Sequence, residues 1–353
     1  MHSAPDPQKR GADGTFLVEV PKKCPLHLGA LLPARLPFRS FLDMSRTPQL
    51  RIASFGLGDI ARKAYLPLMA TRREVRPVLC TRNRATLDLL SDQYRIEETY
   101  ASLEDLMRSA PDAVMVHSAT DSHPEVVAPL LEAGIPVFVD KPLANSLGAT
   151  EALIDLARGK DTLLFVGFNR RYAPLISQLT GRPAPRQLTW HKNRVDLPGD
   201  PRTFLFDDFI HVVDGLRFLG NGPVEDLQIA LDREGSLLAN VQVRWRQGDC
   251  LCTGGMNRVS GITEERIEFY TRDHKWQIEE LQRGYHYHRG VTEPLGFGNW
   301  TPTLEQRGFV AMLDDFMAAV RGRKMPADYL DGVRESHRIC EEVLRRVERG
   351  GLK

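Results

Sequence analysis

The chain has 353 residues, with 47 basic and 46 acidic side chains and a formal net charge of +1 at pH 7. This balance offers no basic excess for nucleic acid and no polybasic block for a membrane surface. No apolar run approaches the roughly 18 residues of a spanning helix. We therefore expect a cytoplasmic protein with a small-molecule partner. The five cysteines lack zinc-site spacing, so we expect reduced thiols and no metal site.

The first 48 residues differ in composition from the rest. They begin with the polar stretch MHSAPDPQKRGADG, and prolines interrupt the mildly apolar run that follows. Such a composition forms no core and makes a poor secretory signal. We expect a disordered or mis-assigned leader, with Met44 as a candidate natural start and residues 1–43 dispensable for stability.

Residues 50–69 read as a short apolar strand, a glycine turn and a helix. Gly56, Gly58 and Ala61 fit the pattern G-x-G-x-x-G/A. In this pattern the first glycine permits a tight turn, the second lets the backbone approach a pyrophosphate, and the small third residue packs the helix on the strand. The helix N-terminus then favours phosphates. Because the turn joins a strand to a helix, the pattern predicts a dinucleotide site.

Strand-like and helical segments go on alternating up to residue 168. The pairs are VRPVLC with RATLDLLSDQY, DAVMVHS with PEVVAPLLEAG, and PVFVD with GATEALIDLARG, and TLLFVGF closes the series. This alternation predicts an α/β fold whose residues 49–168 form an N-terminal Rossmann domain, a doubly wound parallel sheet. Ligands bind outside the carboxyl ends of such strands.

The end of the second strand bears on the choice of cofactor. An acid about 20 residues past the glycines would bind the ribose 2′-hydroxyl of NAD. This region instead holds Thr81, Arg82, Asn83 and Arg84. Arginine can bind a 2′-phosphate that a carboxylate would repel, so we favour NADP over NAD. The alternative is that both arginines are solvated.

The second half has a different pattern. Val241, Val243 and Trp245 alternate along one predicted strand, further strands follow at RIEFY and HKWQIEE, and two helices are expected around 303–321 and 329–347. These features predict a C-terminal α+β domain over 169–353 with an open, mostly antiparallel sheet. Its last helices could pack back on the first domain. An open apolar face favours a homo-oligomer, a dimer or a tetramer.

Two stretches carry candidate catalytic residues. Asp140 and Lys141 follow an apolar strand directly, where a charged pair is costly unless it is used. In FDDFIHVVD, Asp207 and His211 are four residues apart and share a helix face. A carboxylate on one imidazole nitrogen fixes the tautomer and leaves the other free to accept a proton. The alternatives are a solvated lysine and an ordinary surface Asp–His pair.

Taken together, four motifs resemble the Gfo/Idh/MocA oxidoreductase family, and the MviM-type oxidoreductases within it. They are the glycine turn at 56–61, DKPL at 140–143, VGFNRRYAP at 166–174 and DDFIHVVD at 207–214. The resemblance covers nearly everything from about residue 50 onward. It implies hydride transfer between a nicotinamide cofactor and a sugar, polyol or related hydroxyl or ketone.

The resemblance also implies roles for individual positions. Lys141 is the shared catalytic lysine, although Asp140 replaces the family's usual glutamate and shortens its reach. Asp207 and His211 match the family's Asp-x-x-x-His, and together with Lys141 they form the expected catalytic set. Lys141 would polarise the substrate oxygen, and His211, held by Asp207, would take or deliver the proton. The expected cofactor-binding residues are Gly56, Gly58, Asp59, Ile60, Thr81, Arg82, Arg84, Ser118, His123, Asp140, Lys141, Asn169 and Arg170.

Other polar clusters are less informative. Lys192 and Arg194 could face the cleft or solvent equally well. The run GYHYHRG at 284–290 has two histidines but no further ligand for a convincing metal set, and a loop or an edge strand is expected there.

Three functional interpretations remain open at this point. The first is an NADP-dependent dehydrogenase or reductase. The second is an enzyme with tightly held NAD(P) that uses transient oxidation for elimination or glycoside hydrolysis. The third, of another class, is a cofactor-binding regulatory protein without turnover. Fold alone does not separate them.

Overall fold

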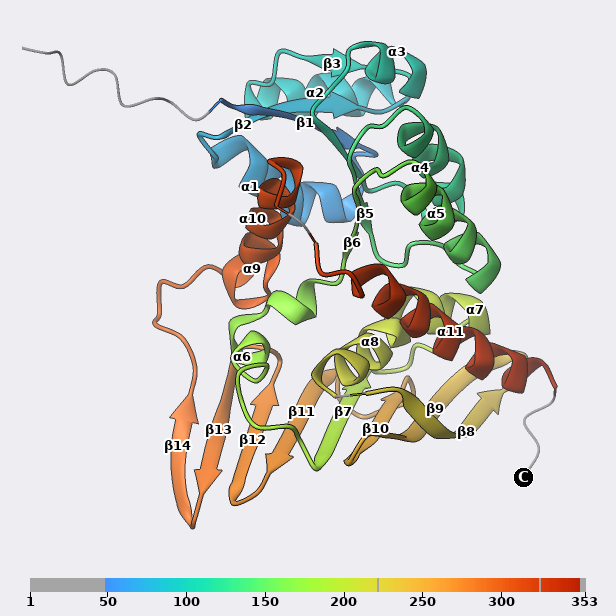
Figure 1. The fold of residues 1–353 in the computed structure, drawn as a ribbon, viewed down its shortest axis with the longest axis vertical. Coiled ribbons are helices and arrows are strands. Elements are labelled where there is room, and N and C mark those ends of the chain that lie inside the picture. The colour runs from blue at the N-terminus through green and yellow to red at the C-terminus, as the bar shows by residue number, and fades with distance from the viewer. Residues whose placement is uncertain (1–47, 221, 324, 350–353) are drawn as a thin grey trace, which may run out of the picture. The chain divides into compact units, whose positions relative to one another are not determined.

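The computed structural model describes residues 48–220, 222–323 and 325–349, and Figure 1 shows their path as a ribbon. The expected leader, residues 1–48, lies outside these ranges except for its last residue. Within the described ranges, no helix has both the length and the apolar composition needed to cross a membrane.

The first half of the described chain forms a six-stranded parallel sheet in the order β3-β2-β1-β4-β5-β6. The strands are β1 Leu50–Phe55, β2 Val75–Cys80, β3 Thr99–Tyr100, β4 Ala113–Val116, β5 Val137–Asp140 and β6 Leu164–Gly167. β4, β5 and β6 are apolar apart from Asp140 at the end of β5, because both faces of the sheet are buried. The strand order reverses between β1 and β4, and such a reversal marks the ligand crevice of a doubly wound sheet. The predicted Rossmann-type sheet is confirmed.

Helices cover both faces of this sheet. They are η1 Ala61–Tyr65 (a π-helix), α1 Leu66–Thr71, α2 Arg84–Tyr94, α3 Leu103–Arg108, η2 Thr120–Ser122, α4 His123–Glu132 and α5 Leu147–Gly159. Asn83, Ser102 and Ser146 cap α2, α3 and α5 by accepting a backbone N–H. In Figure 1, α4 and α5 lie on one side of β5 and β6, and α1 lies on the other. The short β3 and α3 had not been predicted, because neither is long enough to show a clear period.

The second half forms an eight-stranded sheet in the order β14-β13-β12-β11-β7-β10-β9-β8. The strands are β7 Gln187–Asn193, β8 Val224–Glu234, β9 Leu237–Gln247, β10 Cys250–Asn257, β11 Glu264–Thr271, β12 His274–Glu279, β13 Arg283–His288 and β14 Val291–Leu295. Every pairing between neighbours is antiparallel except that of β10 with β7. The predicted α+β domain with an open, mostly antiparallel sheet is thereby confirmed.

One helix of the second half packs closely on this sheet. The helices are η3 Asn169–Tyr172, α6 Pro174–Ser177, α7 Pro201–Thr203, η4 Phe204–Phe209 (a π-helix), α8 Ile210–Leu219, α9 Thr303–Gln306, α10 Phe309–Val320 and α11 Tyr329–Glu348. Gly215 of α8 faces Trp190 of β7, and a Cβ at this glycine would lie 2.2 Å from the Trp190 ring. The glycine therefore sets the close approach of α8 to the sheet.

The chain returns to the first sheet near its end. The Phe316 ring of α10 lies 5.4 Å from the Phe138 ring and 5.6 Å from the Phe165 ring, measured between centroids. Figure 1 shows α10 beside α1, while α11 runs along α5 and α8. One face of the first sheet is therefore covered by an early helix and a late one.

Candidate active site

A cavity of about 1120 Å³ lies at the carboxyl ends of the parallel strands, and residues from both halves of the chain line it. The predicted site residues in its wall are Ile60, Ser118, His123, Asp140, Lys141, Asn169, Arg170, Asp207 and His211. Ile60 and His211, about 150 positions apart in the sequence, therefore share one cavity, as the motifs predicted.

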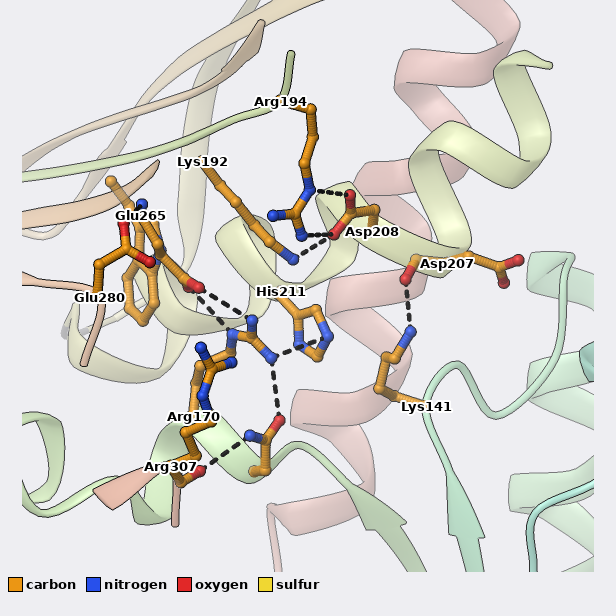
Figure 2. A network of polar contacts seen from close by, with 12 residues as sticks. Lys141, Arg170, Lys192, Arg194, Asp207, Asp208, His211, Glu265, Glu280 and Arg307 are labelled. Carbon is orange, nitrogen blue, oxygen red and sulfur yellow. Dashed lines mark hydrogen bonds and ion pairs between the residues drawn. The ribbon is translucent and has the colours of Figure 1, made fainter. Parts of the chain in front are cut away.

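Lys141 reaches from the end of β5 to the second half of the chain. Its Nζ donates a hydrogen bond of 2.5 Å to the backbone carbonyl oxygen of Asp207, as Figure 2 shows. Burial lowers the pKa of Lys141 from its ordinary value, and the charges of Asp140 and Asp207 oppose this shift. The lysine is half-buried and forms no ion pair with a carboxylate among the described residues, so it can hold or release a proton within the cavity.

Two buried histidines fix the backbone just after Lys141, where a cis peptide joins it to Pro142. His123 places Nδ1 2.9 Å from the Pro142 carbonyl oxygen, and His337 of α11 accepts a 3.1 Å hydrogen bond at Nε2 from Leu143 N–H. The other His123 nitrogen lies 3.2 Å from the Ser118 carbonyl oxygen. His123 thus lines the cavity as predicted, but both of its nitrogens face backbone oxygens.

The expected pairing of Asp207 with His211 is wrong. The exposed carboxylate of Asp207 accepts a 3.2 Å hydrogen bond from Thr120, and His211 Nδ1 has no hydrogen-bond partner among the described residues. The π-helix η4 spans Phe204–Phe209, and α8 begins only at Ile210. The i,i+4 geometry assumed for an α-helix therefore does not apply across this pair. In Figure 2 the Asp207 carboxylate points away from the imidazole.

Arg170 takes the place expected for Asp207. Its Nη1 lies 3.1 Å from His211 Nε2. A guanidinium only donates, so Nε2 supplies the lone pair and Nδ1 carries the proton. Burial, followed by the charges of Arg170 and Lys192, holds the pKa of His211 well below its ordinary value. The imidazole is therefore neutral, and its neighbours oppose protonation.

Arg170 is itself held by a buried carboxylate. Its Nε and Nη2 donate to the two oxygens of Glu265 at 3.0 and 2.9 Å, and Trp190 Nε1 donates to the same carboxylate at 3.1 Å. Burial alone would raise the pKa of Glu265, but the charges of Arg170 and Lys192 lower it to about 2. Asn169 accepts from Arg170 Nη1 at 3.1 Å and so completes the support.

Lys192 and Arg194 both turn inward to Asp208. Lys192 pairs with Asp208, Arg194 lies 3.3 Å from the same carboxylate, and Arg258 joins them at 3.1 Å. Burial, then the charge of Arg170, lowers the pKa of Lys192 to about 7, although Asp208 opposes this. These cations form a second layer behind His211 (Figure 2): Lys192 is buried, Arg194 is half-buried, and neither lines the main cavity, so the structure matches neither the cleft nor the fully solvated alternative.

The glycine turn fits the phosphate-bearing part of a dinucleotide. Gly56 has φ of +84°, and a Cβ there would lie 2.7 Å from the backbone N of Ser118, so only glycine suits the turn. The space beside Gly58 is open. Ile60 lines the main cavity, whereas the exposed Asp59 side chain pairs with Lys63 at 2.9 Å.

A second cavity of about 420 Å³ continues the site toward the end of β2. Gly56, Thr81, Arg82 and Ser118 line it, and Ser118 also belongs to the main cavity. Arg84 lies elsewhere, because it pairs with Asp88 at 3.0 Å on the surface of α2. Its expected place in the cofactor site is therefore not supported, while Thr81 and Arg82 are placed beside the glycine turn.

Sequence reasoning missed three residues of the site: Asp208, Glu265 and Arg307. Asp208 was hidden by its neighbour Asp207, since both precede the same histidine. Glu265 reaches Arg170 because β11 pairs with β7, where Glu265 is opposite Lys192. Strand pairing over such a separation has no local signal. Arg307 lines the main cavity from the end of α9.

Each half of the chain matches a known protein-family model. A family model described as "Oxidoreductase family, NAD-binding Rossmann fold" matches residues 50–168, and one described as "YceM-like, C-terminal domain" matches 180–287. The chain is 33% identical over 304 residues to the Salmonella typhimurium protein named "Putative oxidoreductase YceM". The aligned region covers 84% of this chain and 97% of that protein.

Solved structures give the same result. A Gfo/Idh/MocA family oxidoreductase from Vibrio cholerae superposes with a TM-score of 0.82 at 38% identity, covering 85% of this chain and 99% of that chain. A dehydrogenase (MviM) from Clostridium difficile gives 0.77 at 26% identity, covering 84% and 99%. A more distant relative is the myo-inositol 2-dehydrogenase of Thermotoga maritima, 25% identical over 213 residues, or 55% of this chain and 60% of that one.

Proposed function

Because the chain belongs to the Gfo/Idh/MocA family of oxidoreductases, we propose that it transfers a hydride between a bound nicotinamide dinucleotide and a hydroxyl or ketone carbon of a sugar, polyol or sugar derivative. The observation that carries the proposal is the single cavity in which Ile60 and Ser118 of the Rossmann crevice meet Lys141 and His211. The inositol dehydrogenase among the relatives supports this substrate class.

Lys141 carries the proton in this proposal. When bound, the nicotinamide supplies the hydride acceptor or donor. During oxidation the neutral Lys141 amine accepts the hydroxyl proton, and during reduction the ammonium donates it and stabilises the charge that develops on oxygen. The lowered pKa of Lys141 brings both forms closer to the working pH.

His211 is assigned a different role from the one first expected. Its lone pair faces Arg170, and the surrounding cations oppose an imidazolium. We therefore give His211 the role of a neutral donor, whose Nδ1–H has no partner among the described residues and can orient a substrate oxygen, with Arg170 and Glu265 positioning the ring. Asp207 contributes its carbonyl oxygen to Lys141 rather than a carboxylate to His211.

Turnover of polyols and sugars tests this function. The full chain is incubated with oxidised dinucleotide and a panel of hexoses, inositols and their derivatives, while the absorbance of reduced nicotinamide is followed. We expect the dinucleotide to be reduced only in the presence of one group of these compounds. Dinucleotide that never exchanges, together with release of an elimination or hydrolysis product, would instead identify the transient-oxidation chemistry.

The preferred cofactor is NADP(H). Thr81 and Arg82 line the second cavity, and no acid stands between Thr81 and Arg84, although Glu104 and Glu125 also border that cavity. Fluorescence titration is expected to show tighter binding of NADPH than of NADH. Arg82→Ala should reduce this difference in affinity. Arg84→Ala serves as the control, because Arg84 pairs with Asp88 outside the cavity. Equal affinities in the unmodified protein would contradict the assignment.

A further inference from the structure

Arg307 occupies a fixed position in the wall of the main cavity. Its carbonyl oxygen accepts a 2.9 Å hydrogen bond from Asn169 Nδ2, and Figure 2 labels it below Arg170. The next residue, Gly308, has φ of +82°, and a Cβ there would lie 2.4 Å from the Asn169 carbonyl oxygen and from Ala173 N. The backbone of Arg307 is therefore pressed against the turn that carries Arg170.

The other cations in the cavity wall already have partners. Lys63 pairs with Asp59 at 2.9 Å, Arg170 binds Glu265, and Arg202 donates to the Asn145 carbonyl oxygen at 2.7 Å. Lys141 donates to the Asp207 carbonyl oxygen. Within residues 48–220, 222–323 and 325–349, the guanidinium of Arg307 makes no hydrogen bond or ion pair. Its five N–H donors are available to a ligand.

The acids of the cavity wall do not serve as its counter-ions. Asp121 accepts from Asn145 at 2.5 Å, Asp140 from Lys141 N–H at 2.9 Å, Asp200 from Thr203 N–H at 3.0 Å, and Asp207 from Thr120 at 3.2 Å. Among the described residues, none of these four carboxylates forms a hydrogen bond or an ion pair with Arg307.

The layer behind the cavity adds positive charge. Among the residues that the structure describes, the cationic side chains Arg170, Lys192, Arg194 and Arg258 form ion pairs with two carboxylates, Asp208 and Glu265. Three of these cations are arginines, so the layer keeps a net positive charge even with the pKa of Lys192 lowered to about 7, and buried surroundings screen this charge weakly. An anion in the cavity would be attracted by this layer and by Arg307 together.

We propose that Arg307 binds an anionic group of the substrate, a carboxylate or a phosphate, so that the enzyme acts on acidic sugar derivatives. This inference rests on the proposed function and narrows its substrate class. The planar guanidinium can hold either group through two parallel N–H···O bonds. The fixed backbone of Arg307 would hold that group at a set distance from Lys141 and His211, and so select which carbon reacts.

Equilibrium binding tests the inference without requiring turnover. Hexuronates and hexose 6-phosphates are titrated calorimetrically against the full chain saturated with NADPH, beside their parent hexoses. We expect the charged probes to bind at least about tenfold more tightly, as a charged hydrogen bond provides. Arg307→Gln should remove that preference, with a loss of about 10- to 100-fold for the charged probes only, and Arg307→Lys should restore part of it.

A matched control is Arg321→Gln, which removes an exposed guanidinium outside the cavity and should change none of these affinities. Preference for uronate over phosphate, or the reverse, identifies the anion. Equal binding of charged and neutral probes, or no binding of charged probes at millimolar concentration, would overturn the inference. So would weaker NADPH binding by Arg307→Gln, since the anion would then belong to the cofactor.

The outcomes also separate this inference from the function on which it rests. Hydride transfer to or from neutral sugars with no advantage for acidic ones would leave the proposed function standing and remove the role of Arg307. Binding of acidic probes that depends on Arg307, without hydride transfer for any of them, would remove the proposed function instead.

Discussion

Lys141 and His211 lie in one cavity but in opposite electrostatic settings. Lys141 is near the carboxylates of Asp140 and Asp207, which favour its charged form, while burial disfavours it. His211 is near Arg170, Lys192 and Lys141, and every one of these charges adds to the effect of burial. The lysine can therefore change its protonation state more readily than the histidine.

Substitution of the two residues should separate their roles. Lys141→Ala is expected to lower kcat by about 10²–10⁴-fold, the usual contribution of general acid–base catalysis. His211→Gln should cost less and act partly through KM, because it displaces an orienting imidazole donor rather than the group that transfers the proton. Asp207→Asn should remain close to the unmodified enzyme, since the carbonyl oxygen that meets Lys141 is retained. Steady-state kinetics of the three variants checks these expectations, and their NADPH affinities should remain unchanged. A loss for Asp207→Asn as large as that for Lys141→Ala would contradict it.

The pH dependence follows from the lowered pKa of Lys141. Oxidation needs the neutral amine, so kcat/KM should rise with pH through a midpoint below the ordinary lysine value of 10.5. Reduction needs the ammonium and should fall through the same midpoint. Lys141→Arg is expected to abolish this pH-dependent change in kcat/KM, because a guanidinium does not titrate in the accessible range. If the same pH dependence persisted in Lys141→Arg, the titrating group would be a residue other than Lys141.

Sequence predicted which residues reach the site better than it predicted their partners. Asp140 and Lys141 follow from the end of a buried strand, and the carboxyl edge of a parallel sheet gathers such residues. The partner of His211 does not follow, because the π-helical stretch Phe204–Phe209 changes the spacing on which the Asp–His pairing rested. Arg170 and Glu265 come from elements far apart in the chain, and only the tertiary structure brings them together.

At the scale of elements, apolar periodicity identified the strands and helices of the first half closely. The predicted helix RATLDLLSDQY has the same bounds as α2, Arg84–Tyr94. The contact between α8 and β7 had no such signal, because a glycine inside a helix says nothing about which ring it faces. Trp190 fills the space that a larger residue at position 215 would need.

This contact predicts opposite effects for two helix glycines. Gly215→Ala should destabilise the protein by about 1–3 kcal/mol, because the new methyl group overpacks against Trp190. Gly148→Ala of α5 should be neutral or stabilising by up to ~1 kcal/mol, since nothing lies within 4 Å of its Cβ position and alanine favours a helix. Urea unfolding of both variants checks this. Equal stability of the two would show that α8 can shift away from β7.

At the scale of the whole molecule, the two sheets are not independent. α10 follows the last strand of the second sheet, yet Met312 and Phe316 pack in the same apolar cluster as Ile52, Phe138 and Phe165 of the first. His337 of α11 holds the turn after Lys141. Sequence patterns predicted two domains, but they did not show how much the last helices contribute to the stability of the first sheet.

Phe316→Ala tests this dependence. The loss of a buried aromatic ring should cost about 3–5 kcal/mol of unfolding free energy and should weaken dinucleotide binding, although Phe316 lies outside the cavity. Leu89→Ala, at an apolar side chain that is 61% exposed, is the matched control and should change neither quantity. The measurements are urea unfolding and NADPH titration. Unchanged NADPH binding by a destabilised Phe316→Ala would show that the first sheet folds without α10.

The packing of α10 also has a consequence for the growing chain on the ribosome. About 150 residues separate the last strand of the first sheet from Phe316, which completes that sheet's apolar cluster. At about 5–20 residues per second, synthesis of this interval takes roughly 7 to 30 seconds. During that time the side of the sheet that α10 will cover remains open to water and to neighbouring nascent chains. We expect chaperone dependence to be greatest in this interval and to end when α10 emerges.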